Sequence, residues 1–197
     1  MHNTSEYITE QFANSAQLKK DFGRDNADKI LETAQLMIQA INAGGKLLIC
    51  GNGGSAADAQ HFAAEMIGRL RRDRDPIGAI ALTTDSSNLT AIGNDYSFDD
   101  VFWRQVQSLG SENDILIGLS TSGNSMNVIK AVESAKKKNI KTIALLGKDG
   151  GALSDLVDAA LVVPAQSSMR IQEVHITVVH MWCELIEDAI FPNSRVL

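Results

Sequence analysis

The chain has 197 residues, enough for one domain, or for one domain with a helical extension. Hydrophobic residues make up 44% of it and charged residues 21%, which is typical of a soluble globular protein rather than a disordered or fibrous one. The net charge of −6 argues against a general nucleic-acid binder, which would normally present a basic face.

The N-terminal segment predicts no secretory signal, because residues 1–6 contain neither a basic stretch nor an apolar core. No run approaches the ~18 uninterrupted apolar residues of a membrane span. Cys50 and Cys183 both lie in apolar segments, so we expect buried free thiols in a reducing compartment. The sequence therefore predicts a cytoplasmic protein with no membrane contact.

Residues 5–43 follow a helical pattern, with apolar side chains three or four positions apart. Gly44 and Gly45 end the pattern, as expected at a helix C-terminus. We expect two helices here, separated near Gly23. They would form an N-terminal extension of a single domain that covers residues 1–197.

Beyond residue 45, short apolar runs alternate with segments of helical pattern. The expected strands are 46–50, 77–82, 114–119, 142–146 and 159–163. The expected helices are Ala56 to about Arg71, about 125–138, and about 168–190. Apolar strands alternating with helices are typical of a parallel sheet covered on both faces. The predicted fold class is therefore α/β, a three-layer sandwich around a five-stranded parallel sheet.

The final helix is apolar around nearly its whole circumference, from Ile171 to Ile190. A helix with so little polar surface must be buried on most sides. One small domain can hardly cover it together with the N-terminal helices. We therefore expect a homo-oligomer.

Two Gly- and Ser-rich loops follow the first and third strands, at the sheet edge where ligands bind in parallel sheets. Residues 120–125 place four hydroxyls before a helix start, and hydroxyls with free helix N–H groups can hold an anion without a lysine. The alternative is a serine-rich turn with a helix cap. Residues 51–55 form a similar loop. They fit only a relaxed dinucleotide fingerprint, because Asp85 lies too far away to serve as its acidic residue.

Polar side chains on two apolar helical segments are candidates for chemistry. His61 and Glu65 are four residues apart and share a helix face, while Gln172, His175 and His180 lie on the final helix. A carboxylate and an imidazole suit proton transfer next to a carbonyl. Two imidazoles, a carboxylate and an amide oxygen also suit Zn²⁺. Spacing alone leaves both possibilities open, and for His175 an ordinary packed histidine is favoured.

The ordered combination of these motifs is more specific than any one of them. The segments 50–61 with Glu65, 81–85, 91–96, 119–125 and 170–175 resemble the motifs of the phosphoheptose isomerases, and the likeness runs from about residue 5 to 191. The resemblance implies a SIS domain, which is flavodoxin-like, in a homotetramer with active sites at subunit interfaces. It implies interconversion of sedoheptulose 7-phosphate and D-glycero-D-manno-heptose 7-phosphate, the first step toward ADP-heptose for the lipopolysaccharide core.

The resemblance also implies roles for individual residues. Glu65 and His180 would be the acid–base pair, with Glu65 taking the C1 proton to give a cis-enediol. One Zn²⁺ per subunit would be held by His61, Glu65, Gln172 and His180. The sugar phosphate would be bound by Asn52, Gly53, Ser55, Asp95, Ser120, Thr121, Ser122, Ser125 and Gln172. Because a zinc-bound carboxylate is a weaker base than a free one, either the metal acts as Lewis acid and orienter or Glu65 leaves it during turnover.

An alternative function comes from the same resemblance. SIS relatives include a tetrameric binding module that associates with the bacterial replication initiator DnaA. That module shares the Gly-Asn-Gly loop but lacks an acid and a base at the positions of Glu65 and His180, so the present chain favours the isomerase. The arginines of residues 69–74 are interpreted as a solvated helix end, because Asp73 and Asp75 lie among them.

Overall fold

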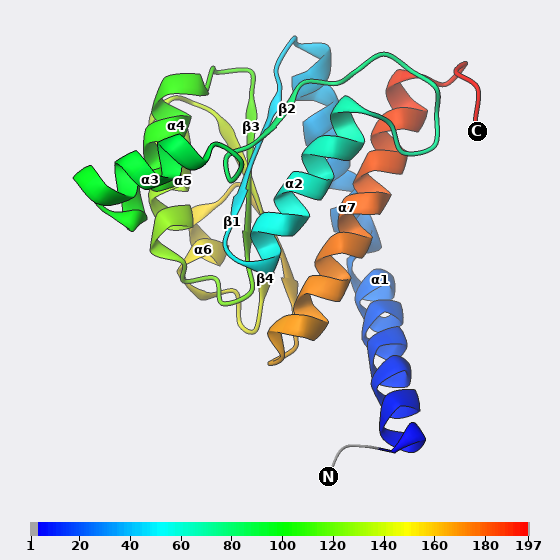
Figure 1. Cartoon of the computed structure of the whole chain (residues 1–197). Helices are drawn as coiled ribbons and strands as arrows, with labels where there is room; N and C mark the ends of the chain where they lie inside the picture. The colour runs from blue at the N-terminus through cyan, green and yellow to red at the C-terminus, as the bar shows by residue number, and fades with distance from the viewer. Residues whose placement is uncertain (1–3, 197) are drawn as a thin grey trace.

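The computed structural model describes residues 4–196, which form a parallel sheet with helices on both faces (Figure 1). The strands are β1 (Leu47–Gly51), β2 (Ala79–Ala81), β3 (Ile115–Ser120), β4 (Lys141–Gly147) and β5 (Ala159–Val163). The helices are α1 (Ser5–Asn42), α2 (Gly54–Ile67), α3 (Ser86–Asp95), α4 (Val101–Leu109), α5 (Met126–Lys137), α6 (Gly151–Leu156) and α7 (Ser168–Ile190), with a short 3₁₀ turn η1 (Phe98–Asp100). Each predicted strand overlaps an observed one.

The strand order is β2-β1-β3-β4-β5, and every pairing is parallel. All residues of β1 and β3 are buried, which explains why their sequences are continuous apolar runs. Because β2 and β3 lie on opposite sides of β1, the winding of the chain reverses between β1 and β3. Such a topological switch point is where open α/β sheets bind ligands. The predicted three-layer α/β fold is confirmed.

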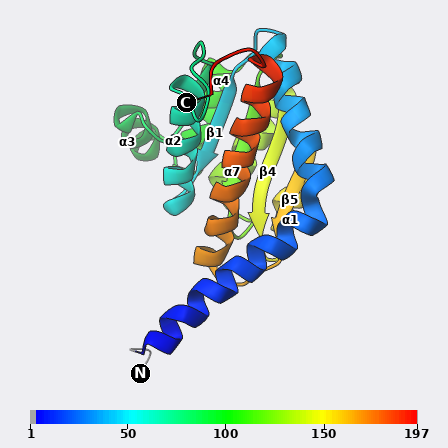
Figure 2. The same ribbon diagram turned by 90° about the vertical axis from the view of Figure 1, so that its right-hand side faces the viewer.

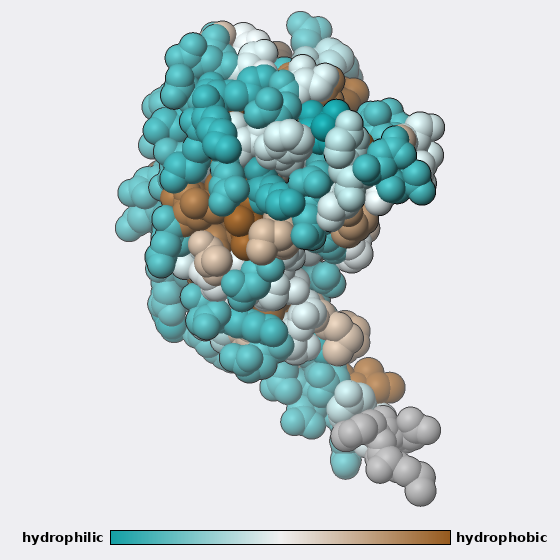
Figure 3. Space-filling model, turned by 90° about the vertical axis from the view of Figure 1, so that its left-hand side faces the viewer, coloured by the Kyte–Doolittle hydropathy of each residue, from teal (hydrophilic) through white to brown (hydrophobic). Residues whose placement is uncertain are grey.

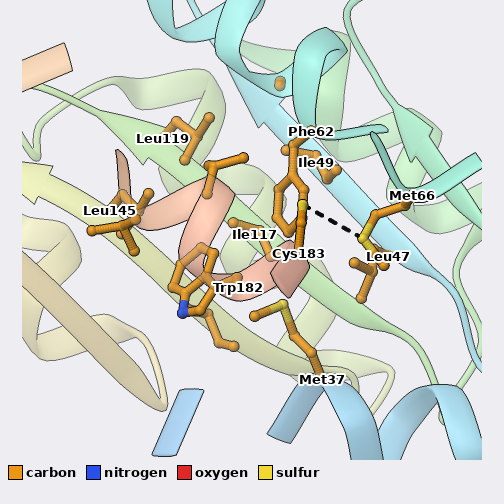
Figure 4. Close-up of a cluster of buried hydrophobic side chains, with 14 of the residues drawn as sticks. Met37, Leu47, Ile49, Phe62, Met66, Ile117, Leu119, Leu145, Trp182 and Cys183 are labelled. Atoms are coloured by element: carbon orange, nitrogen blue, oxygen red, sulfur yellow. Dashed lines mark hydrogen bonds between the residues drawn. The ribbon is translucent and has the colours of Figure 1, made fainter. Parts of the chain in front are cut away.

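Helices α1, α2 and α7 cover one face of the sheet, and α4, α5 and α6 cover the other (Figures 1 and 2). Trp182 of α7 is fully buried on the first face, where its ring stacks on Phe62 of α2 with centroids 5.9 Å apart (Figure 4). Its Nε1 donates to Thr33 Oγ1 of α1 at 2.9 Å. One side chain therefore contacts all three helices, and this packing sets α2 against α7.

The structure of the N-terminal segment shows that one prediction was wrong. Residues Ser5–Asn42 form a single helix of 38 residues rather than two helices separated near Gly23. The helix changes direction along its length in Figure 2, but it is not interrupted. A glycine in a helix costs only about 1 kcal/mol relative to alanine. Burial of Phe22, Ala34 and Met37 in the first face offsets that cost.

The arginine cluster after α2 is not simply a solvated helix end, as the sequence had suggested. Arg69 is exposed, but the Arg74 side chain is 0% exposed and its Nε lies 2.9 Å from Oε1 of Glu187, which is equally buried. Arg74 also donates to the carbonyl oxygens of Glu65 and Met66. The segment following α2 is therefore tied to α7 by a buried ion pair.

Both cysteines are buried and free, as predicted. Burial raises the pKa of the Cys50 thiol to about 12, so this thiol is protonated and unreactive at neutral pH. Within the described residues, none of the helices combines the length and apolar character that crossing a membrane requires. The face over α3 to α6 is mostly hydrophilic, with a small apolar patch near its middle (Figure 3).

Candidate active site

Two helices bring together three of the side chains singled out in the sequence. His61 and Glu65 lie one turn apart on α2, with His61 Nε2 3.2 Å from Glu65 Oε1. His180 of α7 places its Nε2 3.0 Å from the same His61 nitrogen. The His61 side chain is 45% exposed and that of Glu65 20%, so a ligand can reach them. Sequence spacing predicted the His61–Glu65 pair, whereas the approach of His180 follows from the packing of α2 on α7.

The geometry of this group fits a divalent metal. One ligand atom from each of His61, Glu65 and His180 lies within 4.8 Å of the others. Tetrahedral Zn²⁺ with bonds of about 2.0–2.2 Å separates neighbouring ligand atoms by about 3.3–3.5 Å. The observed 3.0 and 3.2 Å are close to that separation. Three protein ligands would leave a fourth position, which the predicted ligand Gln172 would occupy or which would otherwise stay open to water or substrate.

Gln172, the fourth predicted ligand, lies over the first turn of α2. Its side-chain amide packs over Gly54, where an added Cβ would be 2.6 Å from Gln172 Nε2. Gly54 precedes His61 by almost two turns of α2. Within the described chain, Gln172 forms no hydrogen bond with the three clustered side chains. Its role as a metal or substrate ligand stays a prediction.

The loop after β3 gathers three of its four hydroxyls at one point. Ser120 Oγ lies 2.9 Å from Ser125 Oγ and 3.5 Å from Ser122 Oγ. Ser125 is the N-cap of α5, yet its side chain makes no capping bond, so the first N–H groups of α5 stay available to an anion. Gly123 has a φ of +67°, which other residues rarely adopt, and thereby turns the backbone at this point. The geometry supports the predicted phosphate loop.

The remaining hydroxyls lie at the edges of the same region. Thr121 Oγ1 is 3.3 Å from Ser168 Oγ at the start of α7. Ser55, in the first turn of α2, is 3% exposed. Gly53 has a φ of +57° and is the N-cap of α2, where the N–H groups of Ser55 and Ala56 donate to the carbonyl oxygens of Asn52 and Gly53. Both loops therefore offer helix N-termini at the switch point.

Asn52 has a partner that the sequence did not suggest. Its amide exchanges two hydrogen bonds with the amide of Asn127, each 2.9 Å long. Asn127 is only 3% exposed. The sequence contained one signal for this pair. Asn127 is a polar residue on the buried face of a predicted helix, and a buried amide needs a hydrogen-bond partner.

Two further candidates lie apart from the clustered side chains. Asp95 is exposed at the end of α3, and its Oδ1 accepts a hydrogen bond from the neighbouring Asn94. His175 is fully buried, with its Nε2 3.0 Å from the carbonyl oxygen of Leu146. Burial lowers the His175 pKa to about 4, so the ring is neutral at pH 7. His175 is therefore packed in the interior as predicted, but its Nδ1 has no hydrogen-bond partner among the described residues.

The fold and the two loops correspond to a known class of domain. The model of the SIS domain matches residues 10–147, which is more than half of the chain. The chain therefore belongs to the SIS domain family.

Similarity over almost the whole chain narrows this assignment. A phosphoheptose isomerase of Geobacter sulfurreducens is 50% identical, and the match covers 94% of this chain and 98% of that protein. The solved phosphoheptose isomerase of Neisseria gonorrhoeae superimposes with a TM-score of 0.88 at 47% identity, covering 93% of this chain and 98% of the other. That of Francisella tularensis has a TM-score of 0.89 at 40% identity, covering 93% and 97%. Within the SIS family, the chain belongs to the phosphoheptose isomerases, which are sugar-phosphate isomerases.

Proposed function

We propose that the protein interconverts sedoheptulose 7-phosphate and D-glycero-D-manno-heptose 7-phosphate, the first step toward ADP-heptose and the lipopolysaccharide core. The observation that carries the proposal is the convergence of His61, Glu65 and His180 in a fold whose switch point carries two Gly- and Ser-rich loops. The names of the relatives support the substrate class. A carboxylate and an imidazole in these positions favour an enzyme over the initiator-associating module.

The chemistry requires one proton to move between two carbons. The phosphate binds at the 120–125 loop and holds the far end of the open-chain ketose. Glu65 removes a proton from C1, the C1–H electron pair becomes the C1=C2 double bond, and the C2 oxygen receives a proton. Return of a proton to C2 and loss of the O1 proton then give the aldose. His180 moves protons to and from the two oxygens.

A metal ion would bind in the same group of side chains. His61, Glu65 and His180 would hold one Zn²⁺ per subunit, with Gln172 as the fourth ligand that the family pattern implies. When bound, Zn²⁺ would act as a Lewis acid toward the substrate oxygens. Glu65 would then have to divide its carboxylate between metal binding and proton transfer.

We also propose a cytoplasmic homotetramer with active sites at subunit interfaces. Exposed apolar side chains on α1 and α7 support assembly: Ile8, Phe12, Leu31, Met169 and Met181. Leu31 and Met181 line a hollow of about 360 Å³ between the two helices, and most of its surface is apolar. Asp95 ends α3, and this helix lies apart from α2 and α7 in Figures 1 and 2, which supports a role for Asp95 at another subunit's site.

Isotope exchange tests the proposed reaction. The purified protein is incubated with sedoheptulose 7-phosphate in D₂O, with and without added Zn²⁺, and followed by NMR. We expect deuterium at C2 of a new aldose phosphate, with a rate that depends on the metal. Absence of both turnover and exchange under either condition would contradict the isomerase and direct attention to a protein partner.

The phosphate loop has its own prediction. We expect Ser122→Ala to raise KM about tenfold or more with a smaller change in kcat, because a hydrogen bond to a charged group contributes about 1.5–3 kcal/mol. Steady-state kinetics and the inhibition constant of inorganic phosphate measure the effect. The proposed phosphate contact is wrong if this variant binds inorganic phosphate as tightly as the wild type.

A further inference from the structure

The amide pair between Asn52 and Asn127 joins residues 75 positions apart in the sequence. Each side chain donates one hydrogen bond to the other and accepts one, at 2.9 Å in both directions. Asn127 is 3% exposed, while Asn52 is partly exposed. Asn52 can therefore reach a ligand directly, whereas Asn127 can reach one only through Asn52.

The pair spans the point where the winding of the sheet reverses. Asn52 is the first residue after β1, and Asn127 lies in the first turn of α5, directly after the 120–125 loop that follows β3. β1 and β3 are adjacent, with the switch point between their carboxyl ends. The two hydrogen bonds therefore tie together the two loops that border the ligand site.

The residue type at position 127 is unfavourable unless it serves this contact. Asn has a lower helix propensity than Ala or Leu, and an unpaired buried amide would cost free energy. Paired with Asn127, the Asn52 amide is held in one orientation. That orientation leaves Asn52 one N–H and one oxygen lone pair for a ligand.

We propose that Asn127 is a positioning residue that fixes the Asn52 amide and holds the β1–α2 loop in register with the phosphate loop. The inference rests on the proposed function, in which the phosphate binds at one loop and Asn52 contacts the sugar. The Asn52–Asn127 pair would therefore set the distance between the bound phosphate and the reacting carbons. A small displacement between anchored groups can cost a large factor in rate.

The decisive variant is Asn127→Leu, which removes both hydrogen bonds and keeps the number and branching of the side-chain heavy atoms. We expect kcat/KM to fall about 10- to 100-fold, mainly through kcat, because orientation is lost while the phosphate loop persists. The inhibition constant of inorganic phosphate should stay within about twofold of wild type, since it reports on the 120–125 loop alone. Ser134→Ala is the matched control: Ser134 is also buried on α5, and its hydroxyl accepts a hydrogen bond from Gln107 of α4.

A double mutant separates positioning from simple stabilisation. If Asn127 acts through Asn52, then Asn127→Leu should cost nothing further in kcat/KM once Asn52 is alanine. Equal losses in both backgrounds would overturn the inference. So would an Asn127→Leu variant that melts at a lower temperature than the wild type but retains the wild-type kcat/KM.

A spectroscopic measurement that needs no turnover tests this inference independently of the proposed function. The Asn52 side-chain amide signals in a ¹H–¹⁵N spectrum are assigned by their loss in Asn52→Ala. In Asn127→Leu we expect them to shift and to lose protection from solvent exchange. Unchanged Asn52 signals would refute the pairing even in an active enzyme. If the signals shift in Asn127→Leu but the wild-type protein does not turn over sedoheptulose 7-phosphate, the pairing is supported and the proposed substrate is rejected.

Discussion

Replacement of Glu65 by Gln is expected to lower turnover about 10²- to 10⁴-fold, the usual contribution of a general base. The substitution keeps the shape of the side chain but removes the group that takes the C1 proton. Deuterium exchange from D₂O into the substrate should fall by the same factor as kcat, because both require that proton to leave. Steady-state kinetics and NMR exchange measure the two quantities independently.

The control and the metal content decide what such a loss means. Glu133→Gln makes the same chemical change at an exposed position on α5 and should leave kcat unchanged. If Glu65→Gln loses activity but retains the zinc content of the wild type, the carboxylate acts mainly as the base. If zinc and activity disappear together, its role as a ligand accounts for the loss. A Glu65→Gln enzyme with the wild-type rate would refute the mechanism.

Removal of the Glu187 carboxylate is expected to have the largest effect on stability. Glu187 accepts hydrogen bonds from the backbone N–H groups of Leu70, Arg71 and Arg72 as well as from Arg74. In Glu187→Ala, the guanidinium of Arg74 would remain buried without its counter-charge. Breaking a buried pair in this way costs about 3–5 kcal/mol. The free energy of unfolding in urea, measured at one fixed protein concentration, tests this value.

Two other variants provide comparisons for the loss of stability expected in Glu187→Ala. Arg74→Met should cost less than Glu187→Ala, because the remaining carboxylate keeps its three backbone donors. Asp188→Asn breaks the pair with Arg72, in which the Asp188 side chain is 52% exposed, and should cost at most about 1 kcal/mol. If Glu187→Ala were no more destabilising than Asp188→Asn, the buried pair would not be what ties the segment after α2 to α7.

The same carboxylate predicts a dependence of stability on pH. Burial acts to raise the pKa of Glu187, but the three backbone donors and Arg74 outweigh it and hold the pKa below its usual value. The stabilisation is therefore fully present above the unfolded-state pKa of about 4.3. It is lost as the pH falls below that value and through the pKa of the folded state. Unfolding free energies measured between pH 7 and pH 3 should show this loss, and Glu187→Ala should lack it.

Local patterns in the sequence were sufficient for much of the fold. Continuous apolar runs located the five strands, because buried parallel strands have no polar face. The long apolar run of the last helix predicted its approximate bounds, and the observed helix is Ser168–Ile190. Helices α3, α4 and α6 were not predicted, since they are at most ten residues long and their periodic signal is short. The continuity of α1 through Gly23 also depended on tertiary packing.

The candidate site, like the fold, was predicted only in part from the sequence. The sequence by itself determined the two Gly- and Ser-rich loops and the His61–Glu65 pair, because strand ends and four-residue spacing are local properties. Only the tertiary structure decided that His180 meets His61, that Arg74 is buried against Glu187, and that Asn127 holds Asn52. These contacts join residues 75 to 119 positions apart. No local pattern specifies them, because they depend on how α2, α5 and α7 pack on the sheet.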